Sequence, residues 1–206
     1  MNIALTGAHG FIGRLLFDAL VDAGHAVMPV RTDDRLGSAG TWAEAVIHCA
    51  RHHDNIVPPI THEKALLEYE TVANAYEYTR WMAAGNRLRN VIVITSIYGR
   101  IVPDVRPIPW NYQLAKAAEQ QMIRVLAQEL APNIRVNGVE LGGVLSDRAQ
   151  AAQDEPGFLE GYSAKTLLQR MVLPNEVPGA VLFLLSDASK GMTGGIIPVN
   201  GGYGIT

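Results

Sequence analysis

The sequence predicts an α/β protein in which helices cover both faces of a parallel sheet. The chain opens on a β-rich apolar run at residues 3–5, which is followed by a glycine-rich turn and an apolar-periodic helix. Strand-like and helix-like segments then alternate, as they do in βαβ units whose strands pair in parallel. Residues 91–96 form a continuous apolar run ending in hydroxyls, which is typical of a parallel strand buried on both faces.

Length and composition predict one domain spanning residues 1–206. Apolar residues make up 48% of the 206 residues and charged residues 18%, without the bias that marks disordered chains. The net charge of −3 favours binding neither to nucleic acid nor to membranes. One cysteine, Cys49, excludes an intramolecular disulfide and favours a reducing compartment. With no leader-like opening and no apolar run of about 20 residues, we expect a cytoplasmic protein.

The first unit is a strand, a glycine-rich turn, a helix and a second strand. The turn covers residues 6–13, the helix residues 11–22 and the second strand residues 26–31. In this context a glycine triplet indicates dinucleotide binding. Gly7 would permit the tight turn, Gly10 the approach of backbone to pyrophosphate, and Gly13 close packing of helix on strand. The pyrophosphate would lie at the helix N-terminus, where free N–H groups favour anions.

Arg31, at the end of the second strand, bears on the choice of cofactor. Dinucleotide folds that use NAD place a carboxylate there for the ribose hydroxyls, whereas an arginine suits the 2′-phosphate of NADP. We therefore expect NADP(H) to be preferred, with Arg35 assisting. Asp33 or Asp34 could reverse this preference, so NAD(H) stays open.

The segment between the second and third strands is unusually short. Only thirteen residues separate Arg31 from the strand predicted at residues 45–50. A parallel crossover needs about a dozen residues by itself, so a further strand and a second helix cannot fit. We therefore expect the sheet to lack one outer strand. We also expect the protein to bind its cofactor more weakly than proteins that have this strand.

Residues 111–131 predict a long amphipathic helix. Tyr112 and Lys116 lie four residues apart, so a phenol and an ammonium project from neighbouring turns toward one site. The ammonium stabilises the phenolate, and Tyr112 is predicted to exchange a proton near neutral pH. Apolar residues recurring every fourth position are expected to line one face of this helix: Leu114, Ala118, Met122, Leu126 and Leu130.

A polar cluster around the end of the third strand contains candidate metal ligands. These are His48, Cys49, His52, His53 and, further on, His62. No pair has the spacing of a zinc site, so we predict no metal. Because loops at the carboxyl edge of a parallel sheet line ligand crevices, His52 or His53 could contact a substrate.

The order of these motifs resembles the short-chain dehydrogenase/reductase family. The chain carries Thr-Gly-x-x-Gly-x-x-Gly ending at Gly13, a helix asparagine, Ser96 at a strand end, and Tyr112-x-x-x-Lys116. Residues 134–143 and 193–202 look like the family's sixth strand and its last strand with closing turn. The likeness covers nearly the whole chain and implies a Rossmann-type doubly wound sheet with an NAD(P)-dependent activity.

The resemblance assigns roles by position. It makes Tyr112 the general acid/base, and Lys116 the group that favours its phenolate and holds the nicotinamide ribose. Ser96 would hydrogen-bond the substrate carbonyl oxygen, and Asn74 would support a proton relay to water. The resemblance also implies further cofactor contacts at His9, Phe11, Ile12, Cys49, Ala50, Gly142 and Val144.

The sequence also departs from the family pattern. Residues 48–51, His-Cys-Ala-Arg, replace the usual Asn-Asn-Ala-Gly, and Leu141 replaces a customary proline. The glycine spacing resembles the extended branch of epimerases and dehydratases, while the later motifs resemble the reductases. Residues 146–168 correspond to the family's substrate lid, and residues 201–203 could reach a neighbouring subunit, since members are commonly dimers or tetramers.

These features predict an NADP(H)-dependent oxidoreductase that reduces a carbonyl, or an imine, of a small metabolite. Hydride would come from the nicotinamide and the proton from Tyr112. Two alternatives remain open. One is an epimerase or dehydratase that retains its nucleotide, and the other is a nucleotide-binding regulator without turnover.

Overall fold

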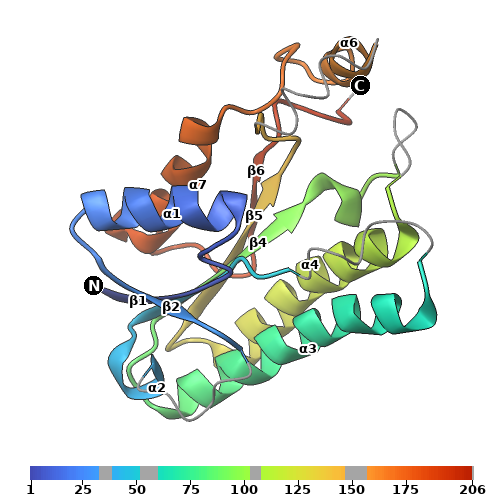
Figure 1. Ribbon diagram of the computed structural model, residues 1–206. Helices are drawn as coiled ribbons and strands as arrows, with labels where there is room; N and C mark the ends of the chain where they lie inside the picture. Colours follow the sequence, from blue (N-terminus) through green and yellow to red (C-terminus); the bar gives the residue numbers. More distant parts are fainter. Residues whose placement is uncertain (33–38, 52–59, 103–107, 147–156, 206) are drawn as a thin grey trace.

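A computed structural model describes residues 1–32, 39–51, 60–102, 108–146 and 157–205. The chain folds into a single six-stranded sheet with helices on both faces (Figure 1). The strands are β1 (Asn2–Thr6), β2 (Ala26–Val30), β3 (Ala45–His48), β4 (Asn90–Ser96), β5 (Arg135–Leu141) and β6 (Ile196–Val199). The helices are α1 (Phe11–Asp22), α2 (Ala39–Trp42), α3 (His62–Ala84), α4 (Trp110–Leu130), α6 (Phe158–Ser163) and α7 (Val177–Leu185), with 3₁₀ turns η2 (Ile97–Gly99), η4 (Pro174–Glu176) and η5 (Asp187–Ser189).

All neighbouring strands of the sheet pair in parallel, in the order β2-β1-β3-β4-β5-β6. The order reverses after β2, which places the crevice at the carboxyl ends of β1 and β3. The predicted doubly wound fold is thus confirmed. The missing outer strand is confirmed as well, because β2 is the edge and no described strand lies beyond it.

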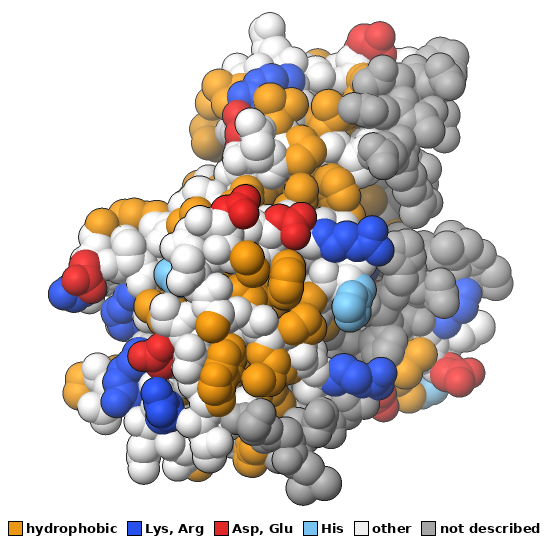
Figure 2. All heavy atoms as spheres, turned by 60° about the vertical axis from the view of Figure 1, so that its left-hand side comes forward, with side chains coloured by type: hydrophobic (Ala, Val, Ile, Leu, Met, Phe, Trp, Pro, Cys, Tyr) orange, Lys and Arg blue, Asp and Glu red, His pale blue; other side chains and the backbone are white. Residues whose placement is uncertain are grey.

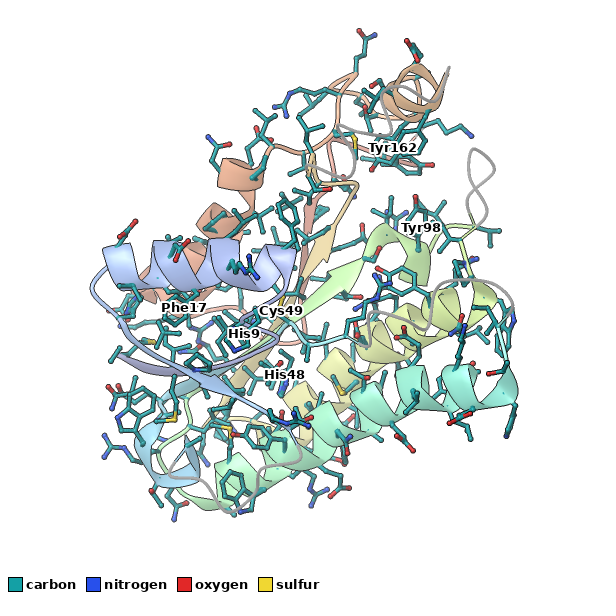
Figure 3. All side chains as sticks on the ribbon, in the orientation of Figure 1. His9, Phe17, His48, Cys49, Tyr98 and Tyr162 are labelled. Atoms are coloured by element: carbon teal, nitrogen blue, oxygen red, sulfur yellow. The ribbon has the colours of Figure 1, made fainter. Side chains whose placement is uncertain are left out.

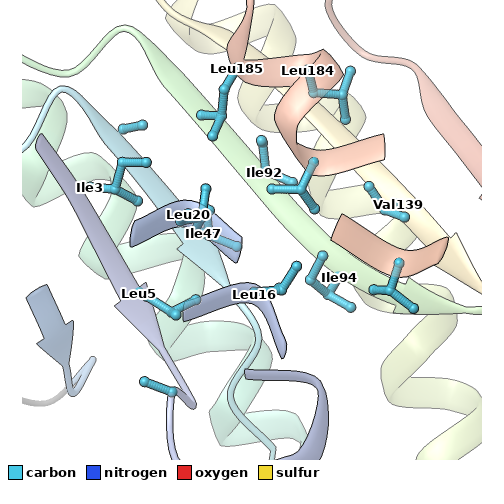
Figure 4. Packing of buried hydrophobic residues seen from close by; sticks show 14 of the residues in the cluster. Ile3, Leu5, Leu16, Leu20, Ile47, Ile92, Ile94, Val139, Leu184 and Leu185 are labelled. Carbon is cyan, nitrogen blue, oxygen red and sulfur yellow. The ribbon is translucent and has the colours of Figure 1, made fainter. Parts of the chain in front are cut away.

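Alternate residues of the central strands supply two separate cores. Ile92 and Ile94 of β4 pack with α1 and α7, whereas Val91 and Val93 pack with α2, α3 and α4. Figure 4 shows the first core, in which Leu16 of α1 meets the strand side chains. This alternation follows from the period of two in a strand, and burial on both faces explains the uninterrupted apolar sequence of β4.

The predicted apolar face of α4 is confirmed in its C-terminal half, where Met122, Leu126 and Leu130 pack in the core, but not in its N-terminal half. Leu114 is 55% exposed and Ala118 is also exposed, whereas Lys116, Glu119 and Gln120 are buried. A strict spacing of four residues drifts around a helix of 3.6 residues per turn, so its first and last members cannot share one face. The N-terminal half of α4 therefore turns polar side chains toward the carboxyl edge of the sheet.

Within residues 201–203, for which a contact with another subunit is predicted, Tyr203 is buried in its own chain. Its side chain is 3% exposed and packs within the same chain, with its ring centre 4.9 Å from that of Tyr162. Both tyrosines belong to a small third core with Ile97 and Met171. This core joins the region after α6 to the carboxyl ends of β4 and β5.

The face that includes the left-hand side of Figure 1 mixes exposed hydrophobic side chains with side chains of both charges (Figure 2). Such interspersed charges provide no extended region of a single sign on the described part of that face. Among the described helices, none combines the length and the apolar character needed to cross a membrane.

His48 is an ionisable side chain enclosed between the sheet and α3 (Figure 3). Thr79 donates its hydroxyl proton to the carbonyl of Ala75, so its oxygen accepts from Nε2–H of His48 at 2.8 Å. The other ring nitrogen, Nδ1, has no partner among the described residues. Burial lowers the pKa of His48 from 6.5 to about 4, because the imidazolium would lose its hydration.

This buried imidazole predicts a loss of stability in mild acid. The unfolded chain binds a proton at His48 below about pH 6.5 and the folded chain only below about pH 4. Stability therefore falls across that window, by about 3 kcal/mol from this group. The variant His48→Gln keeps an N–H donor but cannot titrate. Urea unfolding at pH 7 and at pH 4 should therefore show that its free energy of unfolding falls by about 3 kcal/mol less than that of the wild type. Equal losses in both proteins would contradict the assignment.

Candidate functional site

The glycine-rich turn after β1 is closed by backbone contacts that leave no room for side chains. Gly7 has φ +68°, and a Cβ there would lie 2.6 Å from the carbonyl oxygen of Cys49. A Cβ on Gly13 would lie 2.0 Å from the carbonyl oxygen of Gly7. Gly7 therefore supplies the backbone conformation, and Gly13 the close approach of α1 to the turn.

Gly10, in contrast, faces open space. A Cβ there would meet only the carbonyl oxygen of Gly7, at 3.4 Å. Gly10 is also the N-cap of α1, where no side chain caps the helix and no acidic residue stands in the first turn. The N–H groups that begin α1 can therefore receive an anion.

Thr6 links this turn to the loop after β3. Its hydroxyl oxygen accepts hydrogen bonds from the backbone N–H groups of Cys49 and Ala50, at 3.0 and 3.1 Å. Because β1 and β3 are neighbours in the sheet, one threonine at the end of β1 holds both loops in register. Cys49 is consequently placed beside the glycine turn.

A second set of contacts holds α4 against the end of β4. Gln120 donates from its amide to the carbonyl oxygen of Ser96 at 3.0 Å, and the hydroxyl of Thr95 donates to the carbonyl of Lys116 at 3.3 Å. Where η2 meets the helix, a Cβ on Gly99 would lie 2.7 Å from the backbone of Lys116. The close approach brings Ser96, which caps η2, toward the helix that carries Tyr112.

Tyr112 and Lys116 face the same site, as predicted. Nζ of Lys116 lies 5.6 Å from the centre of the Tyr112 ring. The same ammonium lies 2.8 Å from both carboxyl oxygens of Glu119, one turn further along α4, and both side chains are buried. The predicted pair is therefore a triad in which a carboxylate binds the lysine.

Burial and pairing act in opposite directions on this ion pair. Burial alone would lower the pKa of the Lys116 ammonium, but Glu119 and Tyr112 outweigh it and raise that pKa above its ordinary value. Burial raises the pKa of the Glu119 carboxyl, which Lys116 offsets only in part. The raised pKa of Lys116 favours a charged ammonium, whereas the raised pKa of Glu119 favours a protonated, neutral carboxyl. Contact of the ammonium with both oxygens favours the ionised form at neutral pH.

One cleft of about 380 Å³ connects the glycine turn with Tyr112. It lies at the carboxyl ends of the central strands, and Cys49, labelled in Figure 3, lies close to the start of α1. The structure brings eleven predicted site residues to this cleft: Gly7, Gly10, Phe11, Ile12, Gly13, Cys49, Ser96, Tyr112, Lys116, Gly142 and Val144.

Other predicted site residues lie elsewhere. Asn74 is half-buried on α3 and is not among the residues that line the cleft, and neither is the exposed His9. Ala50 lines a much smaller cavity on the other face of the sheet, together with His48 and Glu119. Arg31 is exposed just after β2, whereas Arg35, Asp33, Asp34, His52 and His53 lie outside the described residues.

The sequence analysis did not identify four residues that line the cleft: Arg51, Ile94, Thr95 and Leu141. Arg51 is the most informative, because its guanidinium carbon lies 4.5 Å from the centre of the Tyr112 ring. Its Nε also lies 3.9 Å from a carboxyl oxygen of the buried Glu68 on α3. The available signal was an arginine directly after residues already assigned to the cofactor loop.

The described part of the predicted lid, residues 157–168, is hydrogen-bonded to the segment that follows β5. Tyr162 is 4% exposed, and its hydroxyl oxygen accepts a hydrogen bond from the backbone N–H of Gly143. Burial raises the pKa of this phenol to about 12, so it is neutral at ordinary pH.

Among the described residues, no group of three or more His, Cys, Asp or Glu side chains could hold a metal ion. His48 and Cys49, two of the candidate ligands considered above, point to different surroundings. His48 bonds to Thr79 on one face of the sheet, and Cys49 lines the cleft.

The chain has recognisable relatives among curated proteins. Its residues 69–204 match the family model described as "Enoyl-(Acyl carrier protein) reductase". It is 34% identical over 136 residues to the uncharacterized oxidoreductase YmfI of Bacillus subtilis (64% of this chain, 54% of that one). It is 30% identical over 173 residues to the ribulose-forming D-arabinitol 2-dehydrogenase of Scheffersomyces stipitis (80% and 62%). The chain thus spans between about half and three-fifths of these relatives' length.

Solved structures share the fold over nearly all of the chain. A short-chain dehydrogenase from Leptospira borgpetersenii with bound NAD⁺ superposes with a TM-score of 0.82 at 22% identity, covering 98% of this chain and 91% of that one. The TT0495 protein of Thermus thermophilus gives a TM-score of 0.83 at 22% identity, covering 99% and 98%. The family model covers most of the chain, and sheet order and cleft agree with it. The chain belongs to the short-chain dehydrogenase/reductase family.

Proposed function

We propose that this chain is an NADP(H)-dependent oxidoreductase that reduces a carbonyl, or an imine, of a small metabolite. The observation that carries the proposal is the single cleft that joins an anion-accepting helix N-terminus to Ser96, Tyr112 and Lys116. A dinucleotide has an anionic end and a reactive end, and this cleft offers groups suited to each.

The residues present fit a dinucleotide. The open space at Gly10 and the uncapped start of α1 suit a pyrophosphate, while Gly142 and Val144 line the cleft beyond the sheet. Lys116 would hold the nicotinamide ribose, and its ammonium contacts Glu119. A bound reduced nicotinamide would supply the hydride for the substrate carbon.

The chain's own residues would act on the substrate oxygen. As the C=O double bond becomes C–H and C–O⁻, Ser96 and Tyr112 donate hydrogen bonds to the growing negative charge. Donors positioned in advance are typically worth about 3–4 kcal/mol each in barrier height. Tyr112 then gives its proton to the oxygen, which yields the alcohol, and recovers a proton from solvent. Proton transfer of this kind contributes roughly 10²–10⁴-fold.

The named activities of the relatives support a small polyol, sugar or cyclic alcohol as the product class. Besides the D-arabinitol 2-dehydrogenase, they include sorbose reductase of Schizosaccharomyces pombe and cyclopentanol dehydrogenase of Comamonas. Each of these names describes the interconversion of an alcohol and a ketone. D-Arabinitol and cyclopentanol with NADP⁺, and sorbose with NADPH, are therefore the first substrates to assay.

Replacing Tyr112 with Phe should abolish turnover and preserve cofactor binding. The variant removes the proton donor but no group assigned to the phosphates, so turnover should fall by at least about 10²-fold. NADPH affinity should stay within about twofold. Absorbance assays would give the first quantity and fluorescence titration the second.

Tyr76→Phe is the matched control, because Tyr76 bonds to Glu129 on an exposed part of α3 and α4, away from the cleft. Retained turnover in Tyr112→Phe would refute the acid/base assignment. A nucleotide that stays bound through purification would favour the epimerase or dehydratase alternative. Bound nucleotide with no turnover on any substrate of the panel would favour the regulator.

The preference for NADP(H) can be tested at Arg31. Loss of a charge-assisted contact to the 2′-phosphate is worth about 1.5–3 kcal/mol, so Arg31→Ala should weaken NADPH binding at least about tenfold. NADH binding should hardly change. Calorimetric titration with both cofactors would measure this, and wild-type affinity for NADPH is expected to be no tighter than micromolar. Equal effects on both cofactors would contradict the role of Arg31.

We further propose a homodimer or homotetramer, as expected from the family. Trp110 and Leu114 are 50% and 55% exposed on the first turns of α4, where a self-complementary contact would cover them. Light scattering on the purified chain would test this, with Leu114→Glu expected to shift the mass toward the monomer.

A further inference from the structure

The Lys116 ammonium interacts with Glu119 as well as with Tyr112. Its ammonium lies 5.6 Å from the centre of the Tyr112 ring but only 2.8 Å from both oxygens of Glu119. Lys116 is 6% exposed and Glu119 7%, so little water screens the pair from its surroundings. A carboxylate in such contact cancels much of the positive potential that the ammonium would exert on a phenolate.

Arg51 brings a second cation to the same ring. Its guanidinium carbon lies 4.5 Å from the centre of Tyr112, closer than the lysine ammonium. Arg51 follows β3 and reaches the ring across the cleft that it lines, so it is independent of α4. A cation at this distance from the ring stabilises both the aromatic face and the negative charge of an ionised phenol.

The two cations differ in how tightly a carboxylate holds them. Arg51 lies 3.9 Å from Glu68 of α3, too far for a hydrogen bond, and 31% of its side chain is exposed. Lys116 lies within hydrogen-bond distance of both oxygens of Glu119. Among the described residues around Tyr112, Arg51 is therefore the cation with the looser ion pair.

Two further described ionisable side chains, Cys49 and Tyr98, lie near the ring. Cys49 lines the same cleft, and burial raises the pKa of its thiol to about 12. Tyr98 of η2 presents its ring edge to Tyr112, with ring centres 6.5 Å apart. Within the described part of the chain, the charges around Tyr112 are thus the cations Lys116 and Arg51 and the carboxylates that pair with them, Glu119 and Glu68.

We propose that Arg51 supplies the positive charge that stabilises the Tyr112 phenolate, while Glu119 holds back the charge of Lys116. This inference rests on the proposed role of Tyr112 as acid/base. Arg51 acts through Tyr112 and is therefore a positioning residue. The ionisation of Tyr112 would then depend on Arg51 in the loop after β3 as well as on Lys116 in α4.

The test measures the ionisation of Tyr112 directly, in the protein without added cofactor. Tyrosine labelled at Cζ gives a carbon NMR signal that moves when the phenol ionises, and the signal missing in Tyr112→Phe identifies this residue. Arg51→Met removes the charge and keeps a long side chain, so the midpoint should rise by about 1 pH unit. Arg51→Lys keeps the charge, so the Tyr112 midpoint in this variant should stay close to its wild-type value. Glu119→Gln should lower the midpoint, because it releases the charge of Lys116.

The pH profile of turnover should move with these midpoints in all three variants. An unmoved Tyr112 midpoint in Arg51→Met would overturn the inference. If KM for the substrate rose at the same time, Arg51 would instead be a substrate-binding residue. If Glu119→Gln fails to fold, the comparison of Arg51→Met with Arg51→Lys decides alone. Shifted midpoints in a protein without turnover would refute the proposed function and leave the charge balance in place.

Discussion

The close packing of η2 on α4 is the constraint on which the site depends. With no Cβ on Gly99, the backbone after β4 comes within contact distance of the backbone at Lys116. Gln120 and Thr95 fasten the same junction with hydrogen bonds to backbone carbonyls. Ser96 ends a buried strand and Tyr112 lies in the first turn of a helix, and this junction holds their two elements together at one cleft. A looser junction would separate the two donors that we propose for the substrate oxygen.

The second requirement is the placement of charge in a poorly hydrated region. A buried ammonium is costly unless a carboxylate meets it, and Glu119 provides this partner one turn along α4. The pairing keeps Lys116 charged and oriented, but it also weakens the field that the lysine exerts on Tyr112. Arg51 on the opposite wall offsets that loss in our proposal. The four residues His48, Cys49, Ala50 and Arg51, which depart from the family pattern, would then serve two functions. His48 is buried between the sheet and α3, and Arg51 lies over the Tyr112 ring.

The segment between β2 and β3 is short. The sheet ends at β2, and in the described part of the segment that follows, the four-residue helix α2 precedes β3. Family membership rests on the match over residues 69–204, which begins after this region. The matched part of the chain thus includes Ser96, Tyr112 and Lys116, whereas Arg31, to which we assign the cofactor preference in our proposal, lies outside it.

By itself, the sequence determined the elements and their order, since glycine spacing, apolar runs and strand–helix alternation are local signals. It identified the glycine turn, Ser96, Tyr112 and Lys116, and it indicated the missing outer strand from the length of one segment. Only the tertiary structure decided which polar residues of α4 are buried, that Glu119 binds Lys116, and that Arg51 lies over Tyr112. Asn74 and Ala50, assigned by position in the motif, lie away from the cleft. Side-chain direction and cross-element distance depend on how elements pack, and no local pattern encodes that packing.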